Sequence, residues 1–284
     1  MHIDIPRHTD TMTPYAGTTT FRSAGRKSGI DMIDHLQQGI LLEEAQRFQE
    51  ALAAYALASQ EEPGNPDPLL RQGALLDEVG DYPNALLAFD KALSLDPYNA
   101  YALSARGDVL STLGRFDAAI EDFSDSILID PEDANAYYNR GLAYASLDQN
   151  EKAIADFATA VQLDPMHGGA YNNMGLAHFK TGAYAEALGD FSNAIRVRQG
   201  FACSFTHRAR VFEALGEVNE AIDDYTRALQ ISPHDPTTLF FRGALYLRLQ
   251  ENKKAREDFE LLLQTAPADN QFRALAKQKL ESGQ

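Results

Sequence analysis

The sequence predicts an all-α protein made of stacked helical hairpins, because one pattern recurs every 34 residues. Proline marks this period at Pro63, Pro97, Pro131, Pro165, Pro233 and Pro267, with Gln199 at the one vacant place. Twelve residues before each of these places stands an alanine, and four residues after that alanine an aromatic residue. Each period also holds two apolar stripes at helical spacing, which predicts two amphipathic helices per period.

Counted from Met32, the period gives seven repeats of 34 residues. They span residues 32–65, 66–99, 100–133, 134–167, 168–201, 202–235 and 236–269. Residues 1–31 are Thr-rich and mildly basic, so we expect a flexible tail there. A targeting segment and a segment that folds back on the acidic first repeats are the alternatives. Residues 270–284 are predicted to form a final helix that caps the last repeat, as solenoids require.

Small residues recur at position 8 of the repeat, which is alanine in repeat 6 and glycine in the other six repeats. A glycine inside a helix costs about 1 kcal/mol relative to alanine, so its recurrence needs a packing reason. We expect the two helices to approach closely there and the aromatic residue at position 24 to fill the adjacent gap. Further glycines, at Gly80, Gly114, Gly182 and Gly216, suit the left-handed end of the first helix. First helices are expected to start after Asn65, Asn99, Asp133 and Asp235, with Pro66 and Pro236 at the first helical position.

Small residues at positions 8, 20 and 27, an aromatic residue at 24 and proline at 32 resemble the tetratricopeptide repeat (TPR) family. The resemblance covers 238 of the 284 residues. It implies an α-solenoid, a right-handed superhelix in which each repeat is a helix-turn-helix of helices A and B. It also implies that the A helices line the concave side.

Two columns of the repeat vary together. Position 7 holds Arg106, Arg140, Arg208 and Arg242 in the repeats where position 23 holds Asp122, Asp156, Asp224 and Asp258. Where position 7 is Gln, position 23 is Ala. This predicts an ion pair from helix A to helix B in repeats 3, 4, 6 and 7, which would fix the register of the helices more than it would add stability. The alternative is a coincidence among solvated surface charges.

Repeat 5 departs from the pattern at both ends. Its entrance has His167 and two glycines in place of an Asn or Asp cap, and its exit lacks proline at Gln199. Phe201 stands where the next cap would be. Ordinary repeat drift and a local hinge with a changed stacking angle both remain open.

Composition excludes several classes of protein. The chain has 25 Lys and Arg against 41 Asp and Glu, a net charge of −16, which disfavours nucleic acid and anionic lipid as partners. No apolar run is long enough to insert in a membrane, and no secretory signal stands out. The single Cys203 excludes a disulfide framework within the chain. We expect a cytoplasmic protein, with organelle targeting by the tail left open.

The sequence offers no catalytic site. No paired histidines, HExxH or CxxC motif occurs, so no metal site is expected. Cys203 and His207 lie four residues apart on one predicted helix, but a lone thiol there is better explained by packing. Residues 25–29 lack the spacing of a phosphate-binding loop. We therefore predict that the protein is not an enzyme and binds no cofactor.

The TPR resemblance places a binding surface on positions 2, 5, 6, 9, 12 and 13 of the A helices. These positions are acidic in repeats 1–3, carry amides and rings in the middle, and are more basic and apolar toward the end. The residues predicted for this groove are Glu44, Asp77, Glu78, Tyr101, Asp108, Tyr138, Asn139, Asn172, Asn173, Phe179, His207, Arg210, Phe240 and Arg248. The gradient predicts that the positive portion of a ligand lies over repeats 1–3 and its negative portion over repeats 5–7.

Asn139 and Asn173 share position 6 and resemble part of the asparagine ladder of some peptide-binding TPR proteins. The cations with which chaperone-binding TPR domains hold a terminal carboxylate are missing around them, so no chaperone clamp is expected. The predicted function is a non-catalytic scaffold or adaptor that binds a protein or peptide partner in the groove. The alternative is a structural protein that assembles into homo-oligomers through its ends or groove.

Overall fold

The computed structural model describes residues 34–197 and 202–282, and in these residues it contains fifteen helices and no strand. The expectations for residues 1–31, Gln199 and Phe201 lie outside this described part. The chain divides after Val109 into two compact units, here called the N-terminal unit and the C-terminal unit. The all-α fold class is confirmed.

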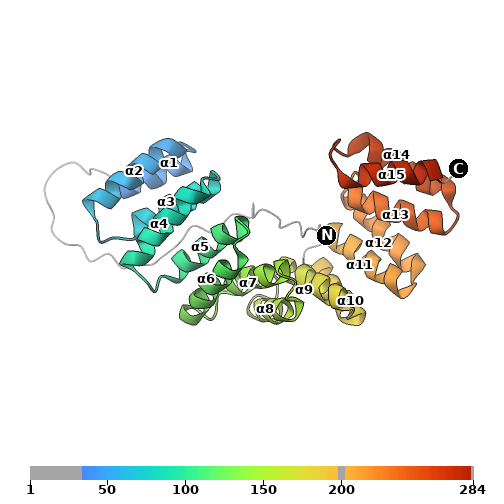
Figure 1. Ribbon diagram of the computed structural model, residues 1–284, viewed down its shortest axis with the longest axis horizontal. Helices are drawn as coiled ribbons and strands as arrows, with labels where there is room; N and C mark the ends of the chain where they lie inside the picture. Colours follow the sequence, from blue (N-terminus) through green and yellow to red (C-terminus); the bar gives the residue numbers. More distant parts are fainter. Residues whose placement is uncertain (1–33, 198–201, 283–284) are drawn as a thin grey trace. The chain divides into compact units, whose positions relative to one another are not determined.

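The N-terminal unit is built from short antiparallel helices that pack in sequence order. They are α1 (His35–Glu44), α2 (Phe48–Glu61), α3 (Asp67–Glu78), α4 (Tyr82–Leu95) and most of α5 (Ala100–Thr112). Helix α1 contacts α2, α2 contacts α3, and α3 contacts α4 (Figure 1). Odd-numbered helices up to α13 correspond to helix A of the repeat, and even-numbered helices to helix B.

The C-terminal unit continues the same succession. Its helices are α6 (Phe116–Ile129), α7 (Ala134–Ser146), α8 (Asn150–Leu163), α9 (Gly168–Thr181), α10 (Tyr184–Val197), α11 (Ala202–Leu215), α12 (Val218–Ile231), α13 (Pro236–Arg248), α14 (Asn252–Thr265) and α15 (Gln271–Ser282). Each contacts its neighbour in the chain, and α9 also contacts α7 and α11, so that A helices lie side by side (Figure 1). This stacking of helical hairpins is an α-solenoid.

In five repeats the core of the hairpin is a ring packed on a glycine, as the sequence predicted, and repeat 6 has Ala209 in place of the glycine. A Cβ added to Gly141 would lie 2.7 Å from Cε1 of Phe157, whose side chain is completely buried. The same arrangement joins Gly39 to Tyr55, Gly73 to Phe89, Gly175 to Phe191 and Gly243 to Phe259. Glycine at position 8 therefore removes the one atom that would collide with the ring of helix B.

The turn between helices A and B has a left-handed residue at the same place in every repeat. Gly80, Gly114, Gly182 and Gly216 have φ between 74° and 81°, as expected. The other three repeats place Gln46, Asp148 and Gln250 there, with φ of 58°, 55° and 61°. A residue with a Cβ pays about 1–2 kcal/mol for this conformation, so packing of the hairpin must enforce it.

Two details of the helix starts differ from the expectation. Helix α3 begins at Asp67, so Pro66 precedes the helix, and Asn65 Oδ1 accepts from the Asp67 amide at 3.0 Å. The entrance of repeat 5 does have a cap, because His167 Nδ1 accepts a hydrogen bond from the Ala170 amide at 3.0 Å. A neutral imidazole nitrogen can accept a hydrogen bond. The sequence did not indicate this cap because Asn and Asp are the usual residues at the position.

The predicted Arg–Asp ion pairs are present in three repeats. Arg140 Nε and Nη2 each donate to Asp156 at 2.8 Å, and the side chains are only 19% and 9% exposed. Arg208–Asp224 and Arg242–Asp258 have the same two-bond geometry. The fourth pair, Arg106–Asp122, has its members in different units and stays a prediction.

Each of these arginines also reaches back to the preceding repeat, which the sequence reading missed. Arg140 Nη1 donates to Ser124 Oγ at 3.0 Å, sixteen residues earlier on helix B of the previous repeat. Arg208 and Arg242 contact Ser192 and Thr226 in the same way. The guanidinium therefore joins two successive B helices, which fixes their spacing.

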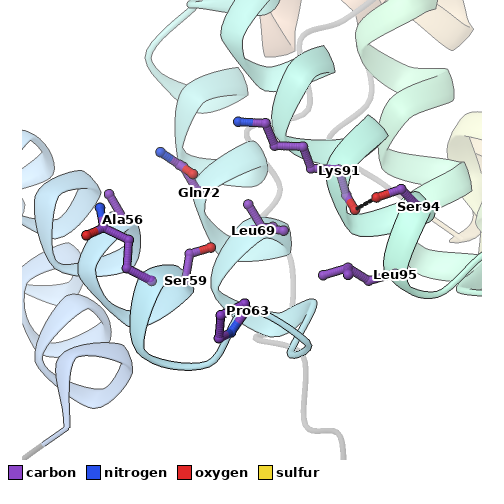
Figure 2. A pocket seen from close by; sticks show the side chains of 9 residues that line it. Ala56, Ser59, Pro63, Leu69, Gln72, Lys91, Ser94 and Leu95 are labelled. Carbon is purple, nitrogen blue, oxygen red and sulfur yellow. Dashed lines mark hydrogen bonds between the residues drawn. The ribbon is translucent and has the colours of Figure 1, made fainter.

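Repeat 2, which lacks this arginine, also lacks the rest of the network. Gln72 stands at position 7 of repeat 2, with Ala88 in place of the aspartate and Ala56 in place of the hydroxyl. An open pocket of about 450 Å³ lies there between α2, α3 and α4. Figure 2 shows Gln72 and Leu69 between Ser59 of α2 and Lys91 of α4. In repeat 5, where Met174 replaces arginine, Asp190 pairs with His178 at 2.6 Å instead.

Candidate functional site

The A-helix face of the C-terminal unit is the surface made by positions 2, 5, 6, 9, 12 and 13 of α7, α9, α11 and α13. Because these helices lie side by side, equivalent positions recur at the spacing of one repeat. Most of the predicted groove residues belong to this face. Asn139 on α7 is half-buried, and the surroundings of the others are as follows.

Tyr138 and Asn172 were expected on the surface, but both are buried, with 3% and 5% exposure. The Tyr138 ring packs on Phe157 and His167, and its hydroxyl accepts from Asn173 Nδ2 at 3.0 Å. Burial raises the pKa of Tyr138 to about 12. The two residues stabilise the stacking of α7 on α9 and of α9 on α11 and are not a contact surface of their own.

His207 is part of the same internal network. Asn172 Oδ1 accepts hydrogen bonds from Ser204 Oγ at 2.9 Å and from His207 Nδ1 at 3.0 Å. Burial lowers the pKa of His207 to about 4, so the imidazole is neutral at pH 7. Its ring packs on Phe191, with the ring centroids 5.5 Å apart. His207 therefore offers a ring edge on this face, not a charge.

Toward the end of the unit an arginine lies between two aromatic rings. The guanidinium carbon of Arg210 on α11 is 5.3 Å from the ring centroid of Phe179 on α9 and 4.8 Å from that of Phe241 on α13. Both distances are in the range of cation–π interaction. Burial lowers the pKa of Arg210, but an arginine keeps its charge at every physiological pH.

Three further charged residues, Lys180, Glu213 and Arg248, occupy positions 12 and 13 of the same face. Glu213 accepts from the Tyr225 hydroxyl at 2.5 Å and pairs with Arg248 at 3.0 Å. Lys180 pairs with Asp148 at 3.1 Å. The side chain of Arg248 remains 60% exposed, so its pairing holds it at the rim and leaves it accessible.

The predicted residues of the N-terminal unit lie on α1, α3 and α5. Glu44 and Glu78 are exposed, whereas Asp77 is half-buried and burial raises its pKa. Tyr101 is half-buried, and burial raises its pKa as well. Asp108 is half-buried on α5.

The candidates for chemistry in the described residues are the Cys203 thiol and clusters of metal-ligating side chains. Burial raises the pKa of the Cys203 thiol to about 11, so this thiol is protonated and not nucleophilic at pH 7. Within residues 34–197 and 202–282, no three His, Cys, Asp or Glu side chains form a group that could hold a metal ion. No helix in this part of the chain is long and apolar enough to cross a membrane.

Comparisons with known proteins agree with the geometry. Models of the TPR repeat match residues 107–148 and 209–250, and models of the tetratricopeptide repeat match residues 36–100, 88–121 and 134–167. Together they cover more than half of the chain. The chain belongs to the tetratricopeptide repeat family.

Solved structures resemble this TPR protein over most of their own length. MamA 41-end from Desulfovibrio magneticus RS-1 is 28% identical with a TM-score of 0.56, over 59% of this chain and 94% of that one. A tetratricopeptide repeat protein from Parabacteroides merdae ATCC 43184 is 21% identical with a TM-score of 0.66, over 88% and 97%. YrrB, described as a TPR protein with an unusual peptide-binding site, is 24% identical with a TM-score of 0.57, over 66% and 96%. The last two show the fold alone.

No curated protein sequence matches this TPR protein. Its tetratricopeptide repeats indicate a protein-interaction scaffold. Neither the family nor these structures identify the partner or the binding surface.

One residue of this face was missed because it lies outside the repeats. Phe272 of α15 stacks on Phe240, with centroids 5.0 Å apart and planes at 30°, and meets Phe241 edge to face at 5.9 Å. In the 34-residue register Phe272 occupies the position of Thr238 and Ser204, both fully buried. An aromatic residue in a column of small buried side chains was the signal that could have indicated it.

Proposed function

We propose that this TPR protein is a non-catalytic adaptor that binds an extended segment of a partner protein in a groove lined by its A helices. The observation that carries the proposal is the recurrence of Asn139 and Asn173 at position 6 of adjacent A helices, followed by Phe179 and Arg210 further along. Amides can bond both the N–H and the C=O groups of a bound backbone, and rings supply rigid contact area.

The spacing of the repeats also suits an extended peptide. Packed helices lie about 8–10 Å apart, and an extended chain advances about 3.3 Å per residue. Equivalent positions of neighbouring A helices would therefore meet every third residue of a bound segment. A ligand that spans α7 to α13 would use about nine residues.

Charge supports an orientation of the segment. Glu44, Asp77 and Glu78 belong to the first two repeats, whereas Arg210 and Arg248 belong to the last two. We propose that the basic portion of the segment lies over the first repeats and its acidic portion over the last. The Asp77 carboxyl, half-buried, would contribute less than the two exposed glutamates.

Self-association is the second candidate function. Leu128 of α6 and Met166, in the turn between α8 and α9, are 82% and 65% exposed. Covering such side chains with a second copy would be favourable. Light scattering separates the two candidate functions. If the protein is a monomer at all concentrations, self-association is excluded and the adaptor function remains.

The proposal predicts that two amides of the A-helix face are needed for partner capture. Asn139→Ala/Asn173→Ala should weaken binding about tenfold to thirtyfold, since each lost hydrogen bond costs about 1 kcal/mol. The partner captured from the native source by wild type would be identified, and its affinity for each variant measured.

The matched control is Asn219→Ala/Asn252→Ala, which removes two exposed amides from the B helices α12 and α14. This control should bind like wild type. Equal losses in both double variants, with circular dichroism showing both folded, would place the binding surface elsewhere.

A further inference from the structure

We infer that Phe179, Arg210, Phe240, Phe241 and Phe272 form an anchor site for a segment of a partner protein that carries an aromatic side chain flanked by carboxylates. This aromatic–arginine site is built by α9, α11, α13 and the terminal helix α15. The inference rests on the proposed function and names the class of segment that the last repeats would bind.

The four rings form one continuous set of contacts. Phe240 meets Phe241 at 5.7 Å, and both meet Phe272 of α15. Arg210 links Phe241 to Phe179, as described above. The contacts thus run without interruption from repeat 5 to the terminal helix.

These rings differ in burial from the rings that form the core. The aromatic residues at position 24, such as Phe191 and Phe259, are completely buried. Phe179, Phe240, Phe241 and Phe272 are each only partly buried and keep exposed surface. Partly exposed aromatic residues beside an arginine have the composition of an interaction hot spot, because a partner ring can bury the remaining surface.

The position of Phe272 indicates that α15 does more than cap the solenoid. A cap needs an apolar edge toward the last repeat, and Ala276, completely buried, and Leu280, half-buried, supply it. Phe272 packs against the same cluster and also stacks on Phe240 of the A-helix face. The terminal helix therefore extends this face by one ring.

Charge complementarity selects the flanking carboxylates. The Arg210 guanidinium lies within cation–π distance of the Phe179 and Phe241 rings, and its N–H donors, in the plane of the group, suit a carboxylate. Glu213, the acidic residue of α11, accepts from Tyr225, pairs with Arg248 and also interacts electrostatically with Arg210. Lys180, Arg210 and Arg248 outnumber Asp148 and Glu213, which makes this face locally positive in a chain of net charge −16.

The site predicts selectivity among simple synthetic peptides. The probes are three nine-residue, end-blocked, fluorescent peptides: phenylalanines among glutamates, phenylalanines among lysines, and alanines among glutamates. Fluorescence anisotropy with the full-length protein should show saturable binding of the first peptide. The other two should bind at least about tenfold more weakly, since each lacks either the ring or the carboxylate contacts.

Single variants then locate the binding. Arg210→Gln and Phe272→Ala should each weaken the Phe/Glu peptide about tenfold, and Arg210→Gln should also flatten the dependence of affinity on salt. The matched control is Arg227→Gln, which removes an exposed arginine from α12 of the same repeat. It should leave the affinity within about twofold of wild type. Phe272→Ala lies in the terminal helix, so it tests the site even where Arg210→Gln destabilises the fold.

Four outcomes would overturn the inference. They are no saturable binding of the Phe/Glu peptide, equal binding of the Phe/Lys peptide, a dimer that Phe272→Ala dissociates, or a gain of tenfold or more in peptide affinity when residues 1–33 are deleted. The last two would assign the site to a second copy or to the chain's own N-terminal segment. The proposed function survives all four if Asn139→Ala/Asn173→Ala still loses the native partner, so the two failures are distinguishable.

Discussion

Asp156→Ala is expected to lower the free energy of unfolding by about 3–5 kcal/mol, because it leaves the Arg140 guanidinium without its carboxylate in a mostly buried place. Arg140→Gln should cost a similar amount, since Asp156 would keep a nearly buried negative charge. Urea denaturation followed by circular dichroism measures both effects. The magnitude reflects the loss of one partner and not the net value of the pair.

The chain itself supplies the double variant that tests this explanation. Repeat 2 has Gln72 and Ala88 at the two positions, so Arg140→Gln/Asp156→Ala copies a combination that already folds in this protein. The double variant should lose less than the sum of the single variants, with a coupling energy of at least about 1.5 kcal/mol. Losses that add within about 0.5 kcal/mol would show that the two side chains do not interact in solution.

Gly141→Ala is expected to destabilise the protein by about 1–3 kcal/mol, although alanine is the better helix former. The new methyl group would lie 2.7 Å from the Phe157 ring, which is completely buried and has no room to withdraw. The gain of about 1 kcal/mol in helix propensity offsets part of this cost. The free energy of unfolding from urea titrations gives the net sign.

Gly189→Ala is the matched control for this substitution. Gly189 lies inside α10, and a Cβ there would have no atom within 4 Å. This variant should gain about 0.5–1 kcal/mol, since only the backbone term remains. Stabilisation by both variants would mean that position 8 does not need glycine for packing.

Much of the fold could be predicted from the sequence because each repeat reports on the others. A glycine at position 8 and a ring at position 24 occur together along the chain, so their contact could be inferred before any coordinates. The Arg–Asp ion pairs could be predicted for the same reason, because Gln at position 7 occurs together with Ala at position 23. Covariation within one chain thus reports contacts that a single repeat would not.

The features that were missed depend on how the helices are arranged in space, which the aligned repeat positions do not show. The Arg140–Ser124 bond crosses from one repeat to the next, so it requires knowing which B helices are neighbours. The burial of Tyr138 and Asn172 depends on how closely A helices stack, which position numbers alone do not give. His167 as a cap required an imidazole acceptor where the statistics favour Asn and Asp.

Part of the candidate site could be proposed from the sequence, but the contribution of the terminal helix could not. Phe179, Arg210 and Phe240 were assigned to the binding surface one repeat at a time. Phe240 contacts Phe272 because α15 continues the 34-residue period beyond repeat 7. This helix has an aromatic ring at the position where earlier repeats have Ser204 or Thr238. A helix outside the repeats has no equivalent helices with which its sequence can be compared, so its contacts are harder to predict.

Photo-crosslinking tests the central claim most directly. A photo-reactive residue would replace Asn139, Asn173 or Phe240 on the A helices, and Asn219 or Arg227 on the B helix α12, in the full-length protein bound to its captured partner. The account predicts crosslinks to one short segment of the partner from the A-helix positions, in chain order, and none from α12. Crosslinks from α12 with none from α7, α9 and α13 would contradict it.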